Sequence, residues 1–410
     1  MSVETRYAVR SVTRNARRTA LSIVGIGVGV ALALLMESVN RGRDELFARV
    51  GATSGVGHLR AVPAGWRAKR DVRMRLADPE GALAAARALP GVEAAAPRAR
   101  AQVLLALGTH VVPVEVAGVD AEAEARVYRF ASKVAPGRWL APGERGAVVV
   151  GQAIADRLRS EVGDEVVATA VGRGGDIESL MLRIVGVVAT GSDETDLSVC
   201  AAPIADVEAL TGLPGAGEVT VVLRDWRATR EARALLAAAL KGGDEVMTWG
   251  EINPEFEGHL QQDAATTRFV SGVILLVVLL GVASAQLAAV LERRREFAVL
   301  AALGMRGWRM VRLVVQEAVA LGLAGGAVGL AVGLPLVWWI SVRGLDFRSF
   351  MGASYSFQGV VFEPVLYGDV GAWIVPYALA VSLGATVLAS LYPAWFAART
   401  DPAAALRAAQ

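Results

Sequence analysis

This 410-residue chain contains little cysteine, histidine or lysine. Cys200 is the only cysteine, so no intrachain disulfide can form. The three histidines have no second ligand nearby at metal-binding spacing, which argues against a metal site. None of the three lysines follows a glycine, so the chain has no P-loop and cannot hydrolyse ATP by that mechanism. The histidines are His58, His110 and His259, and the lysines are Lys69, Lys133 and Lys241.

Other signatures of chemistry are missing as well. No G-x-S-x-G nucleophile motif occurs. The acidic run from Asp193 to Asp196 lacks the remaining oxygen ligands of a calcium loop. The charged part of the chain has no basic stripe interleaved with aromatic residues, so nucleic acid is not an expected partner. We therefore expect a protein that is not an enzyme and that binds no metal or cofactor itself.

Long uncharged runs stand in place of these motifs. Four of them approach or exceed the ~20 residues that a helix needs to cross a bilayer core of about 30 Å. They cover residues 19–36, 269–291, 318–342 and 370–398, with 18, 23, 25 and 29 residues. We predict transmembrane helices at residues 19–38, 268–291, 313–342 and 370–398.

Arginine in short loops marks the cytoplasmic side of a membrane protein. Arginines crowd the segment before the first span and the segment between the second and third spans. This pattern predicts an amphipathic cytoplasmic helix at residues 1–18, a cytoplasmic segment at 292–312 and a cytoplasmic tail at 399–410. The large segment 39–267 and the short loop 343–369 then lie outside, and both termini lie in the cytoplasm.

The large segment carries most of the charge and is long enough to have its own hydrophobic cores. Residues 39–50 and 255–267 are compatible with helix and are predicted to extend the first two spans as a stalk. Strand-like runs indicate a β-rich insert over about 118–198, between two parts of an α+β domain at about 51–117 and 199–254. The expected fold class is a four-helix membrane protein with an extracytoplasmic α+β domain that contains a β-rich insert.

The arginine-rich segment between the second and third spans combines charge with an apolar stripe. A cytoplasmic loop this short cannot fold alone, so the pattern predicts a segment gripped by another protein through charged clamps and an apolar anchor. The predicted contact residues are Glu292, Arg293, Arg294, Arg295, Glu296, Phe297, Leu300, Leu303 and Gly304.

Small residues recur at helical spacing in the first and third spans. Such stripes let helix backbones approach closely inside a membrane, so they predict packing within the subunit or against a partner. The predicted packing glycines are Gly25, Gly29, Gly322, Gly325, Gly326, Gly329 and Gly333.

The membrane half resembles a known family. The run Glu292 to Gly304 is similar to the E-R-x-x-E-[IF]-x-[IV]-L-x-A-[LM]-G segment of FtsX-like ABC transporter permeases. The ending Tyr392 to Arg407 is similar to that family's Y-P-A-x-x-A-[AS]-x-x-[DN]-P-x-x-[AV]-L-R. Within the family, MacB and LolC/LolE permeases have four spans and a large periplasmic domain. Val148 to Gln152 and Ile184 to Gly191 look more like LolC/LolE.

The resemblance implies a permease subunit in a bacterial inner membrane. Two permease chains, as a homodimer or with a sister permease, would pair with two copies of a separate ABC ATPase subunit that binds ATP and Mg²⁺. Residues 292–304 would be the coupling helix seated on that ATPase. The system would act on the periplasmic side, and a lipoprotein or a periplasmic chaperone would be a further partner.

For a lipoprotein, acyl chains would enter between the first two spans from the outer leaflet. The residues predicted to line this entrance are Leu32, Leu35, Met36, Phe269, Val270 and Val273. Two alternatives to lipoprotein release stay open at this point. One is a MacB-like exporter of peptides or small molecules, and the other is an FtsX-like signalling scaffold that activates cell-wall hydrolases.

Overall fold

The computed structural model describes residues 16–303, 305–351, 355–357, 360–362 and 365–398. The predicted cytoplasmic tail and most of the predicted amphipathic helix lie outside these residues. The chain divides into two compact units. The membrane unit comprises Met1–Arg43, Gln261–Leu345 and Leu366–Gln410, and the soluble unit comprises Asp44–Leu260 and Asp346–Val365.

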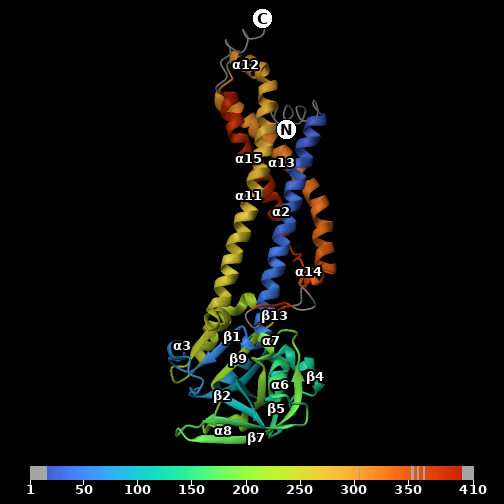
Figure 1. The fold of residues 1–410 in the computed structure, drawn as a ribbon. Helices are drawn as coiled ribbons and strands as arrows, with labels where there is room; N and C mark the ends of the chain where they lie inside the picture. Colours follow the sequence, from blue (N-terminus) through green and yellow to red (C-terminus); the bar gives the residue numbers. More distant parts are fainter. Residues whose placement is uncertain (1–15, 304, 352–354, 358–359, 363–364, 399–410) are drawn as a thin grey trace. The chain divides into compact units, whose positions relative to one another are not determined.

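Four of the described helices are long and apolar enough to cross a membrane, which confirms the predicted fold class (Figure 1). They are α2 (Ala16–Gly51), α11 (Pro254–Glu292), α13 (Gly307–Arg343) and α15 (Ile374–Ala398). The helices α2 and α11 are continuous through the segments expected to form a stalk. Two starts differ from the sequence-based boundaries: α13 begins at Gly307 rather than 313, and α15 begins at Ile374 rather than 370.

A short helix, α12 (Arg294–Ala302), lies between α11 and α13. Arg293 separates it from α11, because the backbone there leaves the helical region with φ −98° and ψ 14°. The helix ends at Ala302 with Leu303 as its C-cap, so α12 is a distinct element and not an extension of either span.

One part of the soluble unit is a four-stranded antiparallel sheet with two helices on one face. Its elements in chain order are β1 (Leu59–Val62), α4 (Pro79–Ala88), β2 (Val92–Leu107), β9 (Glu218–Leu223), α9 (Thr229–Ala239) and β10 (Glu245–Thr248). The strand order β10-β1-β9-β2 is that of a ferredoxin-like βαββαβ unit. Side chains from both helices and from the sheet form its core, which includes Leu59, Ala86, Val221 and Leu236.

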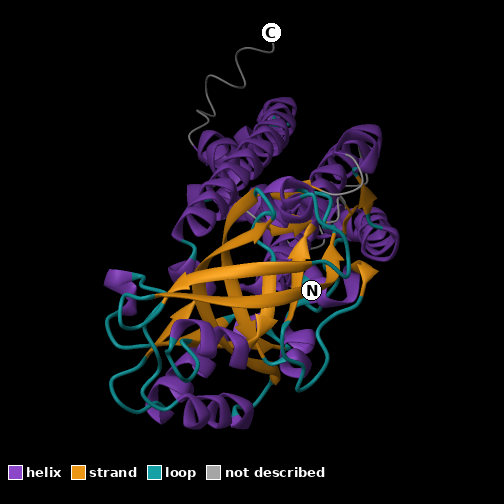
Figure 2. Cartoon of the chain, turned by 60° about the horizontal axis from the view of Figure 1, so that its bottom comes forward, coloured by secondary structure: helices purple, strands orange, loops and turns teal. Residues whose placement is uncertain are grey.

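The insert between β2 and β9 builds a closed ring of strands. In order of pairing, the ring is β2, β3 (His110–Val119), β8 (Cys200–Pro203), β5 (Ala147–Gly151), β7 (Ile177–Val188) and β6 (Glu165–Val171), which pairs back onto β2. Figure 2 shows these strands curving around one another. Val103, Val114, Val148 and Ile184 fill the interior together with the lone cysteine, Cys200.

Short helices and one edge strand complete this barrel. They are α5 (Ala121–Val127), η2 (Arg129–Lys133), β4 (Val134–Gly137), α6 (Gln152–Leu158), α7 (Asp193–Asp196) and α8 (Ile204–Thr211). The remaining elements are η1 (Ala52–Val56), α3 (Trp66–Lys69), η3 (Trp226–Ala228), α10 (Trp249–Ile252), β11 (Leu345–Asp346), α14 (Arg348–Met351), β12 (Tyr355–Phe357), β13 (Val360–Phe362) and β14 (Val365–Leu366).

The border between the two parts of the soluble unit differs from the expected one at residue 118. The strand β2 runs through both parts, because its first half pairs with β9 and its second half pairs with β3 and β6. Residues 99–116 already belong to the barrel core. A strand of 16 residues can take part in two cores, and its one proline, Pro97, lies directly before the point where it passes from one to the other.

Candidate functional site

The helix α12 is anchored to its own chain by its apolar face. Phe297 and Ala298 are buried, and Phe297 packs in a cluster with Val290 of α11 and Leu313 of α13. This corrects the prediction that Phe297 is part of an outward-facing anchor. Phe297 lies on the face of α12 that packs toward the bundle, and the exposed residues lie on the rest of the helix.

Arg293 also faces its own chain. Its guanidinium donates to Glu317 at 2.9 Å and to Glu296 at 3.1 Å, and it lies 5.6 Å from the centre of the Phe297 ring. The predicted contact of Arg293 with a partner is therefore replaced by an ion pair inside the chain. Glu317, which stands at the start of an apolar run, receives its partner from the arginine-rich segment.

Other residues of the predicted contact set stay accessible. Glu292, Arg294, Arg295 and Leu303 are exposed, whereas Glu296 and Leu300 are half-buried. Leu303 is 80% exposed, so an apolar side chain stands in the open on a charged surface. Val299 is exposed as well and was not in the predicted set, and Gly304 lies outside the described residues.

Two glycine stripes on α13 face two different helices. On one stripe, a Cβ at Gly325 would lie 2.5 Å from Ile26, and a Cβ at Gly329 would lie 2.6 Å from Val30, both on α2. On the other stripe, a Cβ at Gly322 would lie 2.5 Å from Thr386 of α15. Real side chains do not approach so closely, so these glycines allow the backbones to meet.

The two remaining predicted glycines of α13 belong to these same two stripes. Gly326 faces Ser382 of α15, and Gly333 faces α2. Gly29 packs against Val278 of α11. Gly25 is different, because a Cβ there would meet nothing within 4 Å.

Packing of Gly25 within the chain is thus not observed, and packing against another chain stays a prediction for that residue. Its place in the chain's own contacts is taken by Gly27, where a Cβ would lie 2.7 Å from Val328 of α13.

A cavity of about 260 Å³ lies between α2, α11 and α15. Its walls are mostly apolar, and Glu37, Asn40 and Arg268 are among the polar residues that line it. They mark one end of the cavity, because they are the last lining residues of α2 and the first of α11. The apolar lining includes Val30, Leu32, Met36, Ile274, Leu275, Val278 and Val381.

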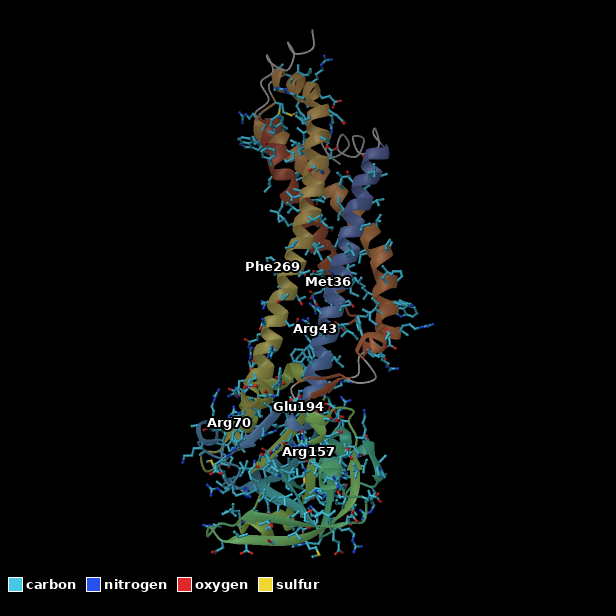
Figure 3. The ribbon with its side chains drawn as sticks, viewed as in Figure 1. Met36, Arg43, Arg70, Arg157, Glu194 and Phe269 are labelled. Carbon is cyan, nitrogen blue, oxygen red and sulfur yellow. The ribbon has the colours of Figure 1, made fainter. Side chains whose placement is uncertain are left out.

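The cavity includes only part of the predicted entrance. Leu32 and Met36 line it, whereas Leu35, Phe269, Val270 and Val273 do not (Figure 3 labels Met36 and Phe269). Phe269 is 73% exposed. The lining positions of α11 follow the helical period through Arg268, Ser271 or Gly272, Leu275, Val278 and Val282, so the predicted trio lies on another face of the same helix.

The contribution of α15 was not foreseen. Tyr377, Val381, Ser382 and Ala385 line the cavity. A signal was present in the sequence, since Ser382, Thr386 and Ser390 recur at helical spacing in an otherwise apolar span, and all three are buried. Beyond the polar end, Arg43 of α2 donates to Asp263 at 2.7 Å and to Thr267 at 3.2 Å on α11.

Acidic residues, histidines and the cysteine do not form a metal centre within the described part of the chain, where no three of them come together in a suitable group. The site therefore consists of an exposed charged helix end, a pair of glycine-packed helix contacts and an apolar cavity.

Comparisons with known proteins match both halves of the chain. A family model described as the FtsX-like permease C-terminal domain matches residues 268–402, and one described as the MacB-like periplasmic core domain matches residues 19–239. The lipoprotein-releasing system transmembrane protein LolC of Neisseria meningitidis is 26% identical over 403 residues, which cover 95% of this chain and 94% of that protein.

Two further relatives have different names and coverage. The macrolide export ATP-binding/permease protein MacB of Shewanella oneidensis is 25% identical over 418 residues, covering 98% of this chain and 60% of that protein. The lipoprotein-releasing system transmembrane protein LolE of Haemophilus influenzae is 24% identical over 329 residues, covering 77% of this chain and 78% of that protein.

Proposed function

Because the chain belongs to the FtsX-like ABC transporter permeases that carry a MacB-like periplasmic core domain, we propose that it releases lipoproteins from the inner membrane. The observation that carries this proposal is the cavity between α2, α11 and α15. An apolar space that ends at polar side chains suits an acyl chain joined to a polar head group. Each buried methylene contributes about 0.8 kcal/mol to binding. The relation to LolC over nearly the full length of both chains supports the same conclusion.

Energy for release would come from a separate ATPase. The chain contains no P-loop, and it aligns with 60% of a MacB whose name includes an ATP-binding function. We assign the ATPase contact to the exposed side of the segment around α12, with Arg294, Arg295 and Leu303 as its centre. Two ATPase copies that hold ATP and Mg²⁺, and two permease chains, would complete the transporter. Both termini would lie in the cytoplasm, since the arginine-rich segments flank the spans on that side.

An exposed apolar face of the barrel supports a soluble partner outside the membrane. Val171 and Ile177 are directly opposed on β6 and β7, as are Val167 and Met181, and all four are exposed. Leu104 of β2 is exposed on the neighbouring strand. Exposed apolar patches on soluble domains mark interaction sites. Such a face would bind a periplasmic chaperone that receives the acylated protein.

Photocrosslinking in the full-length protein in lipid nanodiscs tests the proposal. Ile274 lines the cavity and Val273 does not, so each is replaced in turn by a photoreactive phenylalanine analogue. A fluorescent triacylated lipopeptide should label the Ile274 variant at least about 10-fold more strongly, a ratio worth about 1.4 kcal/mol. Equal labelling of both variants would contradict the proposal.

The same experiment addresses export of the MacB type, which the alignment over 98% of this chain favours. Competition of the labelling by unlabelled lipopeptide supports lipoprotein release. Competition by a macrolide and not by lipopeptide would replace lipoprotein release with small-molecule export.

A further inference from the structure

The end of α2 leads directly into the sheet of the soluble unit. After Gly51 the chain makes one π-helical turn, η1, in which Gly55 has φ +108°. The N–H of Gly57 donates back to Ala52 at 2.9 Å, and β1 begins at Leu59. The last residues of α2, 44–51, belong to the soluble unit and are joined to its sheet through this turn.

Two buried arginines donate hydrogen bonds to the carbonyl oxygens of this turn. Arg60 of β1 donates to the carbonyls of Gly55 and Val56, each at 3.3 Å. Arg98 of β2 donates to the Gly55 carbonyl as well. The C-terminal end of a helix carries partial negative charge, so guanidinium groups are favourable partners for it.

At its other side, each arginine donates to a different carboxylate of the soluble unit. Arg60 donates to Glu218 of β9 at 3.0 Å, within the ferredoxin-like sheet. Arg98 donates to both carboxylate oxygens of Glu124 on α5, at 2.9 Å and 2.6 Å. The helix α5 directly follows β3. Its first residue, Ala121, and its C-cap, Tyr128, pack on the barrel side in a cluster with Val119 and Val149, whereas Ala123 and Val127 pack against β2 and β9 of the sheet. Arg98 therefore connects the end of α2 with a helix that contacts both the barrel and the sheet.

Arg98 also stands where β2 changes neighbours. In the strand register it pairs with Glu218 of β9 on one side and with Val119 of β3 on the other. It is the residue at which the strand passes from the sheet to the barrel. Only 2% of its side chain is exposed.

Apolar packing alone does not fix this junction. A cavity of about 690 Å³ adjoins it, and Gly55, Arg98, Glu124 and Tyr128 are among the residues that line it. Glu218 beside it is ionised at neutral pH: burial raises the pKa of Glu218, but Arg100, Arg60 and Arg98 together lower it to about 2. Without the ion pairs, the turn would have room to move independently of the barrel.

We propose that Arg98 and Glu124 are positioning residues that make the end of α2 and the barrel move as one body, so that movement of the membrane helix reaches the barrel. This inference rests on the proposed function, in which the membrane helices are driven by an ATPase. A buried ion pair is often no more stabilising than an apolar pair of similar volume. Its directional bonds do, however, fix geometry in a way that apolar contacts do not.

The test combines two substitutions, Arg98→Met and Glu124→Leu, in the full chain. The matched control is Arg126→Met with Glu122→Leu, an exposed ion pair of 2.5 Å on the same helix α5. Spin labels at Arg49→Cys on α2 and Arg157→Cys on α6 report the distance between the helix end and the barrel. We expect a narrow distance distribution in the wild type and in the control, and a broadened one in the Arg98/Glu124 variant with its melting temperature retained.

In the complex with the ATPase, the same variant should hydrolyse ATP while lipoprotein release falls about 10-fold. An unchanged distance distribution would overturn the proposal, as would equal broadening in the control. If the double variant does not fold, Arg98→Lys replaces it, because lysine keeps the charge and loses the two-pronged contact with Glu124; a narrow distribution in Arg98→Lys would again overturn the proposal. The distance measurement needs no cargo, so it decides on the junction even if wild-type protein releases no lipoprotein.

Discussion

Arg293 and Glu317 form an ion pair of 2.9 Å that joins the residue before α12 to α13. Both side chains are largely buried, with 19% and 15% of their surface exposed. The pair fixes the base of α12 while the other arginines of the segment stay accessible. One arginine of this segment thus forms an ion pair within the chain, while the other arginines form an exposed charged surface.

We predict that Glu317→Gln loosens α12 without removing its outer surface. Hydrogen bonds to charged groups contribute about 1.5–3 kcal/mol, so the loss should be of that size locally. Co-purification with the ATPase should persist, whereas ATP-driven transport should fall about 10-fold. Arg294→Gln, on the exposed side, should do the reverse and weaken co-purification first. The prediction is wrong if both variants lose the ATPase equally.

The glycine contacts of α13 predict a strong dependence on position. Gly329→Ala places a Cβ 2.6 Å from Val30 and 3.0 Å from the carbonyl of Gly27, so the helices must separate. Overpacking of this kind costs about 1–3 kcal/mol. Thermal unfolding of the full-length protein in detergent should show a lower melting temperature. Gly25→Ala and Gly384→Ala meet nothing within 4 Å and should leave the melting temperature unchanged.

Filling the helix cavity should reduce binding of an acylated ligand. Gly272 lines the cavity, and a Cβ there meets no atom within 4 Å, so Gly272→Leu can be accommodated while it occupies the space. We expect about a 10-fold weaker affinity for a triacylated lipopeptide, measured by fluorescence anisotropy in nanodiscs. Val273→Leu adds a side chain of the same kind on another face of α11 and should bind as the wild type does. Equal weakening by both variants would speak against the cavity as the binding site.

His58 predicts a pH dependence of stability. Burial lowers its pKa from 6.5 to about 4, and its Nδ1 accepts a hydrogen bond from the N–H of Leu223. Between these two values the unfolded chain binds a proton that the folded chain does not, so stability is lost as the pH falls from 6.5 towards 4. The full effect is about 3 kcal/mol, since one pKa unit corresponds to about 1.4 kcal/mol.

The variant His58→Gln tests this by removing the titrating group. Thermal unfolding of the full chain at pH 7.5, 5.5 and 4.5 should show a shallower loss of stability than in the wild type. The control is His110→Gln, which is less buried and lies at the turn between β2 and β3. A slope for His58→Gln that matches the wild type would show that the acid sensitivity originates elsewhere.

The sequence predicted the existence of the four membrane helices well, because the length of an uncharged run is enough to identify such a helix. Uncharged runs identified the four long helices, because the bilayer sets their minimum length. Spacing predicted orientation around a helix less well. Phe269 and Ser271 are two residues apart in one apolar run, and only the neighbouring helices decide that Ser271 faces the cavity. Phe297 was assigned outward for the same reason, since its partners on α11 and α13 are not visible in the local pattern.

In the soluble unit, the pairing of distant strands could not be predicted from the sequence. Arg60 and Glu218 are 158 residues apart in the chain, and Arg98 meets Glu218 only because β2 pairs with β9. Strands of ordinary composition carry no mark of which distant strand they pair with. The two-part architecture was therefore foreseen, whereas its junction at Arg98 was not.

The lone thiol has a practical consequence for studying this protein. Cys200 is buried in the barrel core, and burial raises its pKa to about 12. A thiolate is the nucleophile that attacks maleimide and disulfide reagents, so the natural side chain is protected from labelling at neutral pH by both its position and its protonation. The wild-type chain already serves as a chemically silent background. A reporter attached through any introduced surface cysteine will report on that position alone.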